Sequence, residues 1–446
     1  MPYDLRADRE ALGDAAAAAL AARVDLVARA TVAGVEEGAA FGRRLRTAGV
    51  EAVLVLQTLA VMPAYTVAVL DELPDVPVVV WALNRSRRVP ADLDHAAITS
   101  EGATVGTPML TNTLVRSARP FALVVGILDD ETTLLAAADA LRAAAVASRL
   151  RRSRVGRVGP VFAGYVCVDA DDDRLRAATG IEAVRIEAAE FRELYVAVEP
   201  ARVAALERET RQLYDVQPDA EGDVLARSLR AACALDELVD RYRLDAGALN
   251  CHVPEIRFGE EVGIAPCFAL GRQTSRGVPW ACAGDVVTAV AMLTLKLLGG
   301  AAQYHELESL DYETGELVVA SSGEHDLAFA GERPRLQRNL WYDADPRCGA
   351  CACFAAPAGP ATLVGFTELD APPGYRYVVA RGEFTGTGWP AVGTPHAAFR
   401  FHGDGVDAWT RWCRAGANHH SAATPGDFAA GVESVARFLG VESAHV

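Results

Sequence analysis

Three short apolar runs in the first third of the chain constrain its fold more than any other feature. Residues 51–57, 76–83 and 121–127 are rich in Val, Leu and Ile and show no regular alternation with polar residues. Strands with such continuous apolar runs are covered on both faces, which is typical of a parallel sheet flanked by helices. Helical periodicity over residues 9–30 and 36–48 supplies such helices. The pattern therefore predicts an α/β fold for this region.

A second α/β segment is expected after the basic run at residues 149–154, which reads Arg-Leu-Arg-Arg-Ser-Arg. Arginine at a helix end complements the helix dipole, so we interpret this run as a solvated helix end close to a domain boundary. Strands are expected at residues 155–165 and 184–186, and helices at 201–214 and 225–242. The glycines of Gly156-Arg-Val-Gly159 lie in a strand pattern and lack the rest of a dinucleotide fingerprint, which argues against nucleotide binding.

The clearest single helix is expected at residues 285–298, where Asp285 offers an N-cap and Gly299-Gly300 a stop. Its residues are apolar nearly all round, with Lys296 as the exception, so the helix should be buried. Beyond it, strand-like runs separated by Gly- and Pro-rich turns favour a β-rich region, closed by a helix at residues 427–439. These runs are residues 315–320, 361–368, 375–383 and 396–402. We therefore predict three domains, at residues 1–153, 154–300 and 301–446.

The charge balance limits the classes of partner. The chain has 446 residues and a formal net charge of −16, whereas nucleic acids and anionic membranes select for basic surfaces. No targeting signal and no run of about 18 uncharged apolar residues is evident, so we expect a cytoplasmic protein without a membrane span.

Nine scattered cysteines suit a reducing compartment. Cys348, Cys351 and Cys353 form a CxxCxC cluster, but no second ligand pair follows at zinc-finger spacing, which favours a structural role.

Carboxylates and histidines gather just after the buried helix and again near the C-terminus. Glu306 and Glu308 lie two residues apart, so on a regular strand they would share one face. Gly323-Glu324-His325-Asp326 follows within one hairpin length. His419 and His420 form a pair in an expected loop between two helical patterns, where one imidazole can face a metal while the other contacts a ligand. Carboxylate and imidazole together suit a divalent ion such as manganese, whereas the alternative is an exposed set of surface groups.

Three segments of the chain resemble motifs of the L-arabinose/L-fucose isomerase family. Ala-Cys-Ala-Gly-Asp at residues 281–285 is similar to the family motif Ala-Glu-Gly-Asp, and residues 306–313 are similar to Glu-x-Tyr-Ser-x-Asp-Phe-Glu. Gly-Ala-Asn-His-His at residues 416–420 resembles the C-terminal His-His signature. The resemblance implies two Rossmann-like α/β domains followed by a barrel-like β domain, and a homo-oligomer, which we expect to be a trimer or hexamer. It also implies a sugar substrate, Mn²⁺ or another divalent cation, and interconversion of an aldose and a ketose.

Carried over by position, the resemblance makes Glu306 a metal ligand and proton carrier and His420 a metal ligand. The family's other glutamate falls on Ala283 and its remaining histidine on Ser321, which cannot replace them. We therefore expect Glu324 to be catalytic together with Glu306, and His325 to complete the metal site with Glu306 and His420. Residues expected to contact the substrate are His419, Asp285 and Glu308. Glu308, Glu324, His325 and Asp326 are the candidates to compensate for Ala283 and Ser321.

These departures leave two alternatives to a divergent sugar isomerase. The first is a non-catalytic homologue that binds a sugar or regulates a partner enzyme. The second is a sugar-processing enzyme on the same fold, such as an epimerase or lyase, whose chemistry needs no metal.

Overall fold

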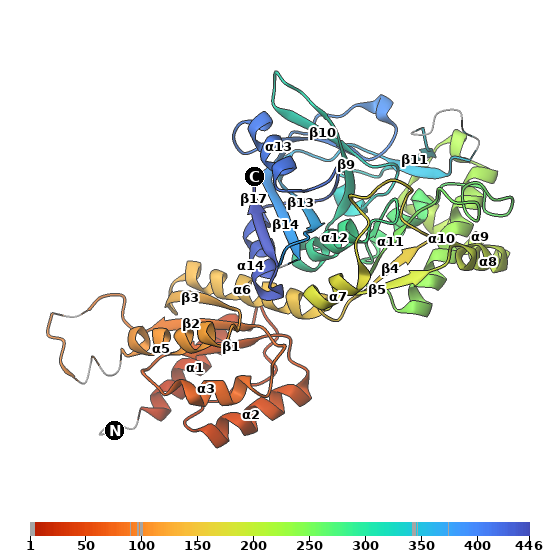
Figure 1. The fold of residues 1–446 in the computed structure, drawn as a ribbon. Coiled ribbons are helices and arrows are strands. Elements are labelled where there is room, and N and C mark those ends of the chain that lie inside the picture. The colour runs from red at the N-terminus through yellow and green to blue at the C-terminus, as the bar shows by residue number, and fades with distance from the viewer. Residues whose placement is uncertain are drawn as a thin grey trace. The chain divides into compact units, whose positions relative to one another are not determined.

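The computed structural model describes residues 5–89, 91–95, 98, 101–340, 345, 347–372 and 374–446. The chain divides into two compact units, and each is described by itself (Figure 1). The first comprises Met1–Arg149 and Arg437–Gly440, and the second comprises Leu150–Ala436 and Val441–Val446.

The first unit contains a three-stranded parallel sheet in the order β1-β2-β3, with helices around it (Figure 1). The central strand β2 is buried over residues 78–83, as the continuous apolar run predicts. The helix expected at residues 9–30 is shorter than predicted and ends at Leu20, where the Arg23 side chain donates a hydrogen bond to the Ala19 carbonyl. The elements are β1 (Val53–Gln57), β2 (Val78–Asn84), β3 (Phe121–Ile127), α1 (Arg6–Leu20), α2 (Val35–Ala48), α3 (Pro63–Leu70), α5 (Ala103–Arg116) and α6 (Glu131–Leu150).

The second unit contains a four-stranded parallel sheet in the order β5-β4-β7-β8. The strand predicted at residues 155–165 stops at Val158, because Gly159 has a left-handed φ of 76° that turns the chain out of the sheet. The strands are β4 (Arg154–Val158), β5 (Glu182–Ile186), β7 (Ala246–Leu249) and β8 (Trp280–Ala281). The helices of this part are α7 (Asp172–Thr179), α8 (Ala188–Ala197), α9 (Pro200–Leu213), α10 (Asp223–Tyr242) and α11 (Cys267–Ser275).

The C-terminal strands of this unit pair in a ring. β13, β16, β9, β10, β15 and β14 follow one another, and β13 and β14 pair along their whole length, so the sheet closes on itself. These strands are β9 (Gln303–Leu310), β10 (Glu316–Ala320), β13 (Gly359–Glu368), β14 (Tyr375–Phe384), β15 (His396–Phe401) and β16 (His420–Pro425), with β17 (Glu442–His445) added to β14. A small sheet joins β6 (Asp215–Val216), β11 (Arg335–Arg338) and β12 (Ala350–Cys353). Two helices complete the region, α13 (Gly405–Arg414) and α14 (Ala429–Leu439).

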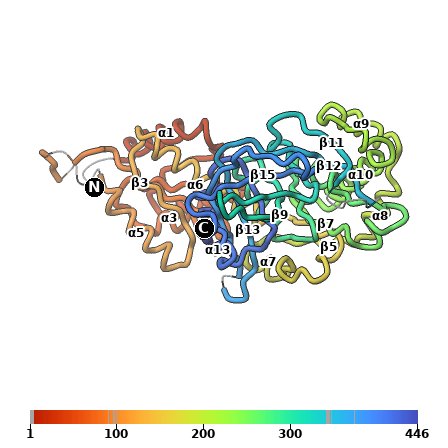
Figure 2. The backbone as a smooth tube through the Cα atoms, turned by 90° about the horizontal axis from the view of Figure 1, so that it is seen from above, coloured from red at the N-terminus to blue at the C-terminus, as the bar shows by residue number. Residues whose placement is uncertain are grey.

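Helix α12 (Val286–Gly299) packs against strands of both large sheets of the second unit, which explains why its sequence is apolar on every side. Asp285 caps it by accepting a hydrogen bond from the Thr288 backbone N–H, and Gly300 ends it with a φ of 85°. The one charged residue, Lys296, is buried and lies 2.6 Å from the Asp326 carboxylate. In Figure 2 the C-terminal strands (blue) lie beside the segment at residues 150–300 (yellow to green).

Replacing Asp326 by alanine should lower the free energy of unfolding by about 3–5 kcal/mol, because it leaves the Lys296 ammonium buried without its carboxylate. It also removes the acceptor of the Ala302 backbone N–H. Urea-induced unfolding followed by circular dichroism measures the change. The double variant Lys296→Met/Asp326→Leu should recover most of the loss, since no charge then stays buried. A loss of less than about 1 kcal/mol in Asp326→Ala would show that the ion pair is solvated.

The predicted fold class is confirmed as α/β with parallel sheets and a β-rich C-terminal sheet. The boundaries at residues 153 and 300 remain predictions. Among the described residues, no helix combines the length and the apolar character that crossing a membrane requires.

Candidate active site

Glu306 and His420 lie directly opposite each other on the neighbouring strands β9 and β16. Opposed residues on an antiparallel pair project from the same face, so this pairing brings together side chains 114 residues apart in the sequence. His419 precedes β16 by one residue, and its ring centroid lies 4.0 Å from that of His420. Ligand atoms of Glu306, His419 and His420 all lie within 4.8 Å of one another. These three side chains form the carboxylate–histidine cluster.

The loop before β16 fixes the direction of both histidines. Asn418 accepts a hydrogen bond from the His420 backbone N–H at 2.5 Å, and the His419 carbonyl accepts one from the Leu307 N–H at 2.8 Å. The His420 Nδ1 atom lies 2.7 Å from Asp285 Oδ2, and Thr288 holds that carboxylate with its backbone N–H and its hydroxyl. Because Nδ1 is committed to Asp285, the His420 Nε2 lone pair is left for the cluster.

Hydrogen bonds from neighbouring side chains also fix the direction of Glu306. The Tyr304 hydroxyl and the Ser322 hydroxyl both donate to Glu306 Oε1, each at 3.1 Å. These two donors hold one carboxylate oxygen, so the other is available to a ligand in the cluster. Burial lowers the pKa of His419, so its imidazole is neutral at pH 7 and offers a lone pair.

Glu324 is a second carboxylate beside the cluster, and it is only 1% exposed. Neither of its oxygens has a hydrogen-bond partner of normal geometry among the described residues, although the Glu324 backbone N–H, the Cys282 thiol and His420 each act to lower the pKa of the carboxyl. A thiol is a weak donor. Burial, followed by the charge of Glu306, therefore raises the pKa of Glu324 to about 7. A carboxyl group with this pKa can take up and release a proton near neutral pH.

Half-buried aromatic rings extend from the cluster in a row, and the sequence patterns did not indicate them. The Tyr165 ring lies 5.4 Å from His419, Phe162 lies 4.8 Å from Tyr165, and His252 lies 4.9 Å from Phe162. We call Phe162, Tyr165 and His252 the aromatic wall. They stand on segments that leave the carboxyl ends of β4 and β7, the edge where parallel sheets bind ligands. Phe162 and Tyr165 were hidden inside the strand predicted at residues 155–165, which in fact ends before them.

His325, which we expected to complete the metal site, does not join the cluster. Its Nε2 atom lies 2.7 Å from the Tyr214 hydroxyl, and its ring packs near Phe268. Burial lowers the pKa of His325 to about 4, so it is a neutral core histidine. His419 takes the third place in the cluster instead.

Asp285 and Glu308, both expected to touch the substrate, lie elsewhere. Asp285 is fully buried behind His420 and orients that ring. Glu308 is the extra residue of a β-bulge between β9 and β10, so the regular alternation expected from Glu306 does not hold, and its side chain is exposed. Protein atoms around the bulge displace part of the water near the carboxyl group. This desolvation, followed by the charge of Glu306, raises the pKa of Glu308.

The remaining candidates have structural contacts. Asp326 pairs with Lys296, and the Ser321 hydroxyl donates to the Glu324 carbonyl at 2.6 Å, which shapes the turn that presents Glu324. Ala283 has a φ of 55°, an unusual conformation for a residue with a side chain, and its carbonyl accepts a hydrogen bond from the Phe162 N–H. No cluster of metal-ligating groups among the described residues includes Cys348, Cys351 or Cys353.

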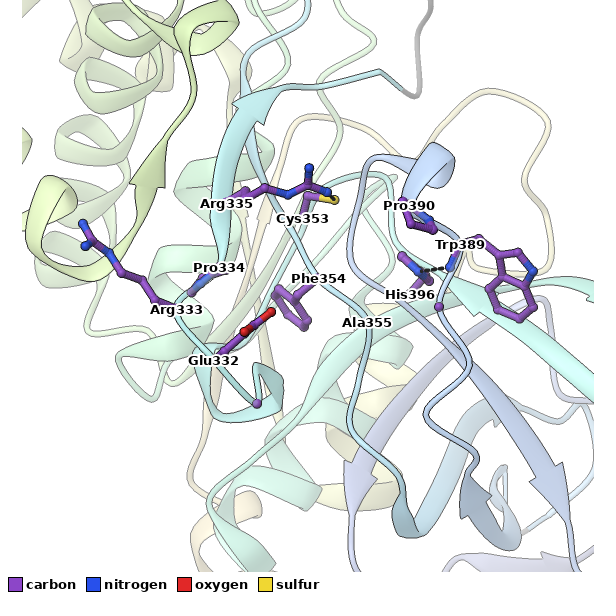
Figure 3. Close-up of a pocket in the computed structure, with 12 residues that line it drawn as sticks. Glu332, Arg333, Pro334, Arg335, Cys353, Phe354, Ala355, Trp389, Pro390 and His396 are labelled. Carbon is purple, nitrogen blue, oxygen red and sulfur yellow. Dashed lines mark hydrogen bonds between the residues drawn. The ribbon is translucent and has the colours of Figure 1, made fainter.

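A separate hollow of about 440 Å³ lies between the end of η2 (Leu327–Phe329), β12 and the segment before β15. Arg335, Cys353, Phe354, Trp389 and His396 are among its lining residues (Figure 3). Both ring nitrogens of His396 are engaged, by the Trp389 N–H and by the Thr394 carbonyl. None of the cluster residues lines this hollow, so the chemistry described above lies elsewhere.

The donor set of the cluster fits a divalent transition metal. It combines one carboxylate and two imidazoles, and each of Glu306 and His420 is held by an outer hydrogen bond that leaves an atom for the ion. The unpartnered Glu324 carboxylate beside it supplies further negative charge.

The chain has homologues of known name. It is 24% identical over 370 residues to proteins named sulfoquinovose isomerase from Priestia aryabhattai and Priestia megaterium, covering 82% of this chain and 79% of each relative. A protein of the same name from Alkalicoccus urumqiensis is 24% identical over 315 residues, covering 69% of this chain and 67% of the relative. No protein-family model matches the chain. The chain is thus homologous to sugar isomerases, and the predicted enzyme class, an aldose–ketose isomerase, is confirmed.

Proposed function

We propose that this protein interconverts the aldose and ketose forms of a sulfonated hexose of the sulfoquinovose type, with a divalent cation such as Mn²⁺. The convergence of Glu306, His419 and His420 next to the unpartnered carboxylate of Glu324 carries this proposal. The names of the three homologues supply the substrate class. We also infer a divergent relation to L-arabinose and L-fucose isomerases, with their two Rossmann-like domains, barrel-like domain and homo-oligomeric state.

Glu306, His419 and His420 would hold the cation, and Asp285, Tyr304 and Ser322 would orient two of these ligands. When bound, a divalent cation would polarise the sugar carbonyl and the adjacent hydroxyl. This donor set differs from the family pattern, because His419 takes the place that the family gives to a histidine at the position of Ser321.

Glu324 is the residue that we assign to proton transfer between carbons. Its ionised carboxylate takes the proton from carbon 2 of the open-chain aldose and returns it to carbon 1, which leaves a carbonyl at carbon 2. A proton also moves from the hydroxyl on carbon 2 to the oxygen on carbon 1, and Glu306 is the carboxylate that would carry it. Cys282, the neighbour of Ala283, contacts Glu324, so Glu324 approaches the region where the family places its missing glutamate.

The aromatic wall would bind the sugar. Aromatic side chains pack against the C–H groups of sugars, and the Tyr165 phenol adds a polar group next to the cluster. Burial and the charge of Glu306 raise the pKa of Tyr165, so its hydroxyl stays protonated and can donate a hydrogen bond to a sugar oxygen.

The proposal is tested by incubating the purified protein with sulfoquinovose in ²H₂O and following the sugar by NMR. We expect a ketose product that carries deuterium from solvent at carbon 1, because a carboxylate exchanges its proton with water. Activity should disappear on chelation and return with Mn²⁺. Turnover by the fully chelated protein would support the metal-independent alternative. A folded protein that converts no sulfoquinovose with any divalent cation would contradict the proposal.

A further inference from the structure

A cluster of charged side chains lies at the far end of the aromatic wall. The Arg257 Nη1 atom lies 3.4 Å from His252 Nε2, and the next ring along, Phe258, has its centroid 6.1 Å from that of His252. Arg257 and Arg347 both place their guanidinium groups over the Phe258 ring, at 5.7 and 4.8 Å from its centroid. We call Arg257 and Arg347 the arginine pair, and Asp345 their shared carboxylate.

The two guanidinium groups share one acid. Arg257 donates to Asp345 Oδ2 at 2.6 Å, and Arg347 Nε donates to Asp345 Oδ1 at 2.9 Å. Hydrogen bonds from Arg347 and Arg257 hold the pKa of Asp345 below its usual range, so this carboxylate is ionised at neutral pH. Two cations and one anion leave the cluster with one net positive charge, in a chain whose net charge is −16.

The cluster has a buried and an accessible member. Arg257 is almost fully buried beside His252, where solvent screens its charge little. Arg347 has a side chain that is 44% exposed, and its guanidinium can donate directly to a ligand. The planar fork of donors on arginine matches the oxygens of a tetrahedral anion.

Arg257 and the proton-carrying carboxylate of Glu324 influence the same two buried cysteines. The buried thiols of Cys251 and Cys267 each lie within electrostatic range of both the Arg257 guanidinium and the Glu324 carboxylate. The row of half-buried rings from His419 through Tyr165 and Phe162 to His252 runs from the carboxylate–histidine cluster to the neighbour of Arg257. A sugar lying on this wall would place its reacting carbons at the carboxylate–histidine cluster and its other end towards the arginine pair.

We propose that Arg347 and Arg257 form the subsite that recognises the anionic group of the substrate, with Asp345 fixing both guanidiniums. The inference rests on the proposed function for the identity of the sugar. An acidic protein repels an anionic substrate over most of its surface, so a fixed local cation is needed to bind it. A sulfonate and a phosphate ester share this chemistry, since both present tetrahedral oxygens and negative charge.

The test compares three sugars that differ in the group at carbon 6, namely sulfoquinovose, D-glucose 6-phosphate and D-glucose. Calorimetry gives the dissociation constant of each, and turnover gives kcat/KM where the sugar reacts. In Arg347→Gln, affinity for sulfoquinovose should fall by roughly tenfold or more, the effect of losing a hydrogen bond to a charged group. Affinity for D-glucose should change by less than about twofold. Arg208→Gln, which removes an exposed arginine from α9, is the matched control and should change neither.

Two further variants keep the test decisive if one protein folds poorly. Arg257→Lys keeps the charge but loses the fork, and should weaken sulfoquinovose binding selectively. Asp345→Asn weakens the acceptor that fixes both guanidinium groups and should therefore also weaken sulfoquinovose binding selectively. A parallel effect on D-glucose 6-phosphate identifies a general anion subsite, and an effect on sulfoquinovose alone identifies a sulfonate subsite, so both support the inference.

Equal effects of Arg347→Gln and Arg257→Lys on the charged and uncharged sugars would overturn it. Failure of the proposed isomerase function would give a different experimental result. A protein that binds sulfoquinovose through Arg347 but isomerises no sugar would keep the anion subsite and refute the isomerase.

Discussion

Replacing Glu306 by glutamine should remove the bound divalent cation and reduce kcat by at least about a thousandfold. The amide cannot supply an anionic oxygen to the cluster, and its NH₂ group would face the Tyr304 or Ser322 hydroxyl in place of an acceptor. A thousandfold loss corresponds to about 4 kcal/mol, in line with the transition-state stabilisation that a metal supplies. Metal content after purification, measured by mass spectrometry, and kcat with added Mn²⁺ together check the prediction.

Glu308→Gln is the matched control. It changes a carboxylate two residues away, but one that is exposed at the β-bulge and outside the cluster. We expect normal metal content and a change in kcat of less than about fivefold, within the range of an ordinary surface substitution. The assignment of Glu306 fails if Glu306→Gln retains a full equivalent of tightly bound metal.

Replacing Glu324 by glutamine should reduce kcat by about 100- to 10,000-fold while the protein keeps its metal. The side chain is not one of the three clustered residues that we propose as ligands, yet it is the buried carboxylate that we assign to proton transfer. Loss of turnover with normal metal content separates this role from that of Glu306. A variant that retains the wild-type rate of deuterium incorporation from ²H₂O would show that another group carries the proton.

The pH dependence gives an independent check on Glu324. Its ionised form is the base, so wild-type kcat/KM should fall as the pH drops through about 7. The contribution of Glu324 to the free energy of unfolding changes with pH in the opposite direction. The folded pKa is raised above the unfolded value of 4.5, so the stabilising contribution is present below pH 4.5 and is lost as the pH rises through about 7. Glu324→Gln should therefore gain stability relative to the wild type above pH 7, by up to about 3 kcal/mol. Unfolding of chelated protein at pH 5 and pH 8 measures this difference.

Much of the local structure follows from the sequence because its causes are local. The strands at residues 53–57, 78–84 and 121–127 lie where continuous apolar runs predict them. The expected burial on both faces holds for the central strand β2, whereas Leu123 and Val125 of the edge strand β3 are exposed. Helix α12 begins after the side-chain cap Asp285 and ends before Gly300, which adopts a left-handed φ, so both of its ends also have local causes. The predicted ends of elements are less accurate. Helix α1 stops at Leu20, ten residues before the predicted end, and β4 stops at Val158, where Gly159 turns the chain.

The sequence, through its resemblance to a known family, indicated two of the three clustered residues, Glu306 and His420. Their place follows from motifs that lie next to predictable strands and helices. Only the tertiary structure decided that His419 joins them and that His325 belongs to Tyr214. It also placed Phe162, Tyr165 and His252 in one row. These outcomes depend on strand register, a β-bulge and the crossing of loops from separate strands, which bring together residues more than a hundred positions apart. Such long-range pairings are set by packing of the whole unit, and no local pattern encodes them.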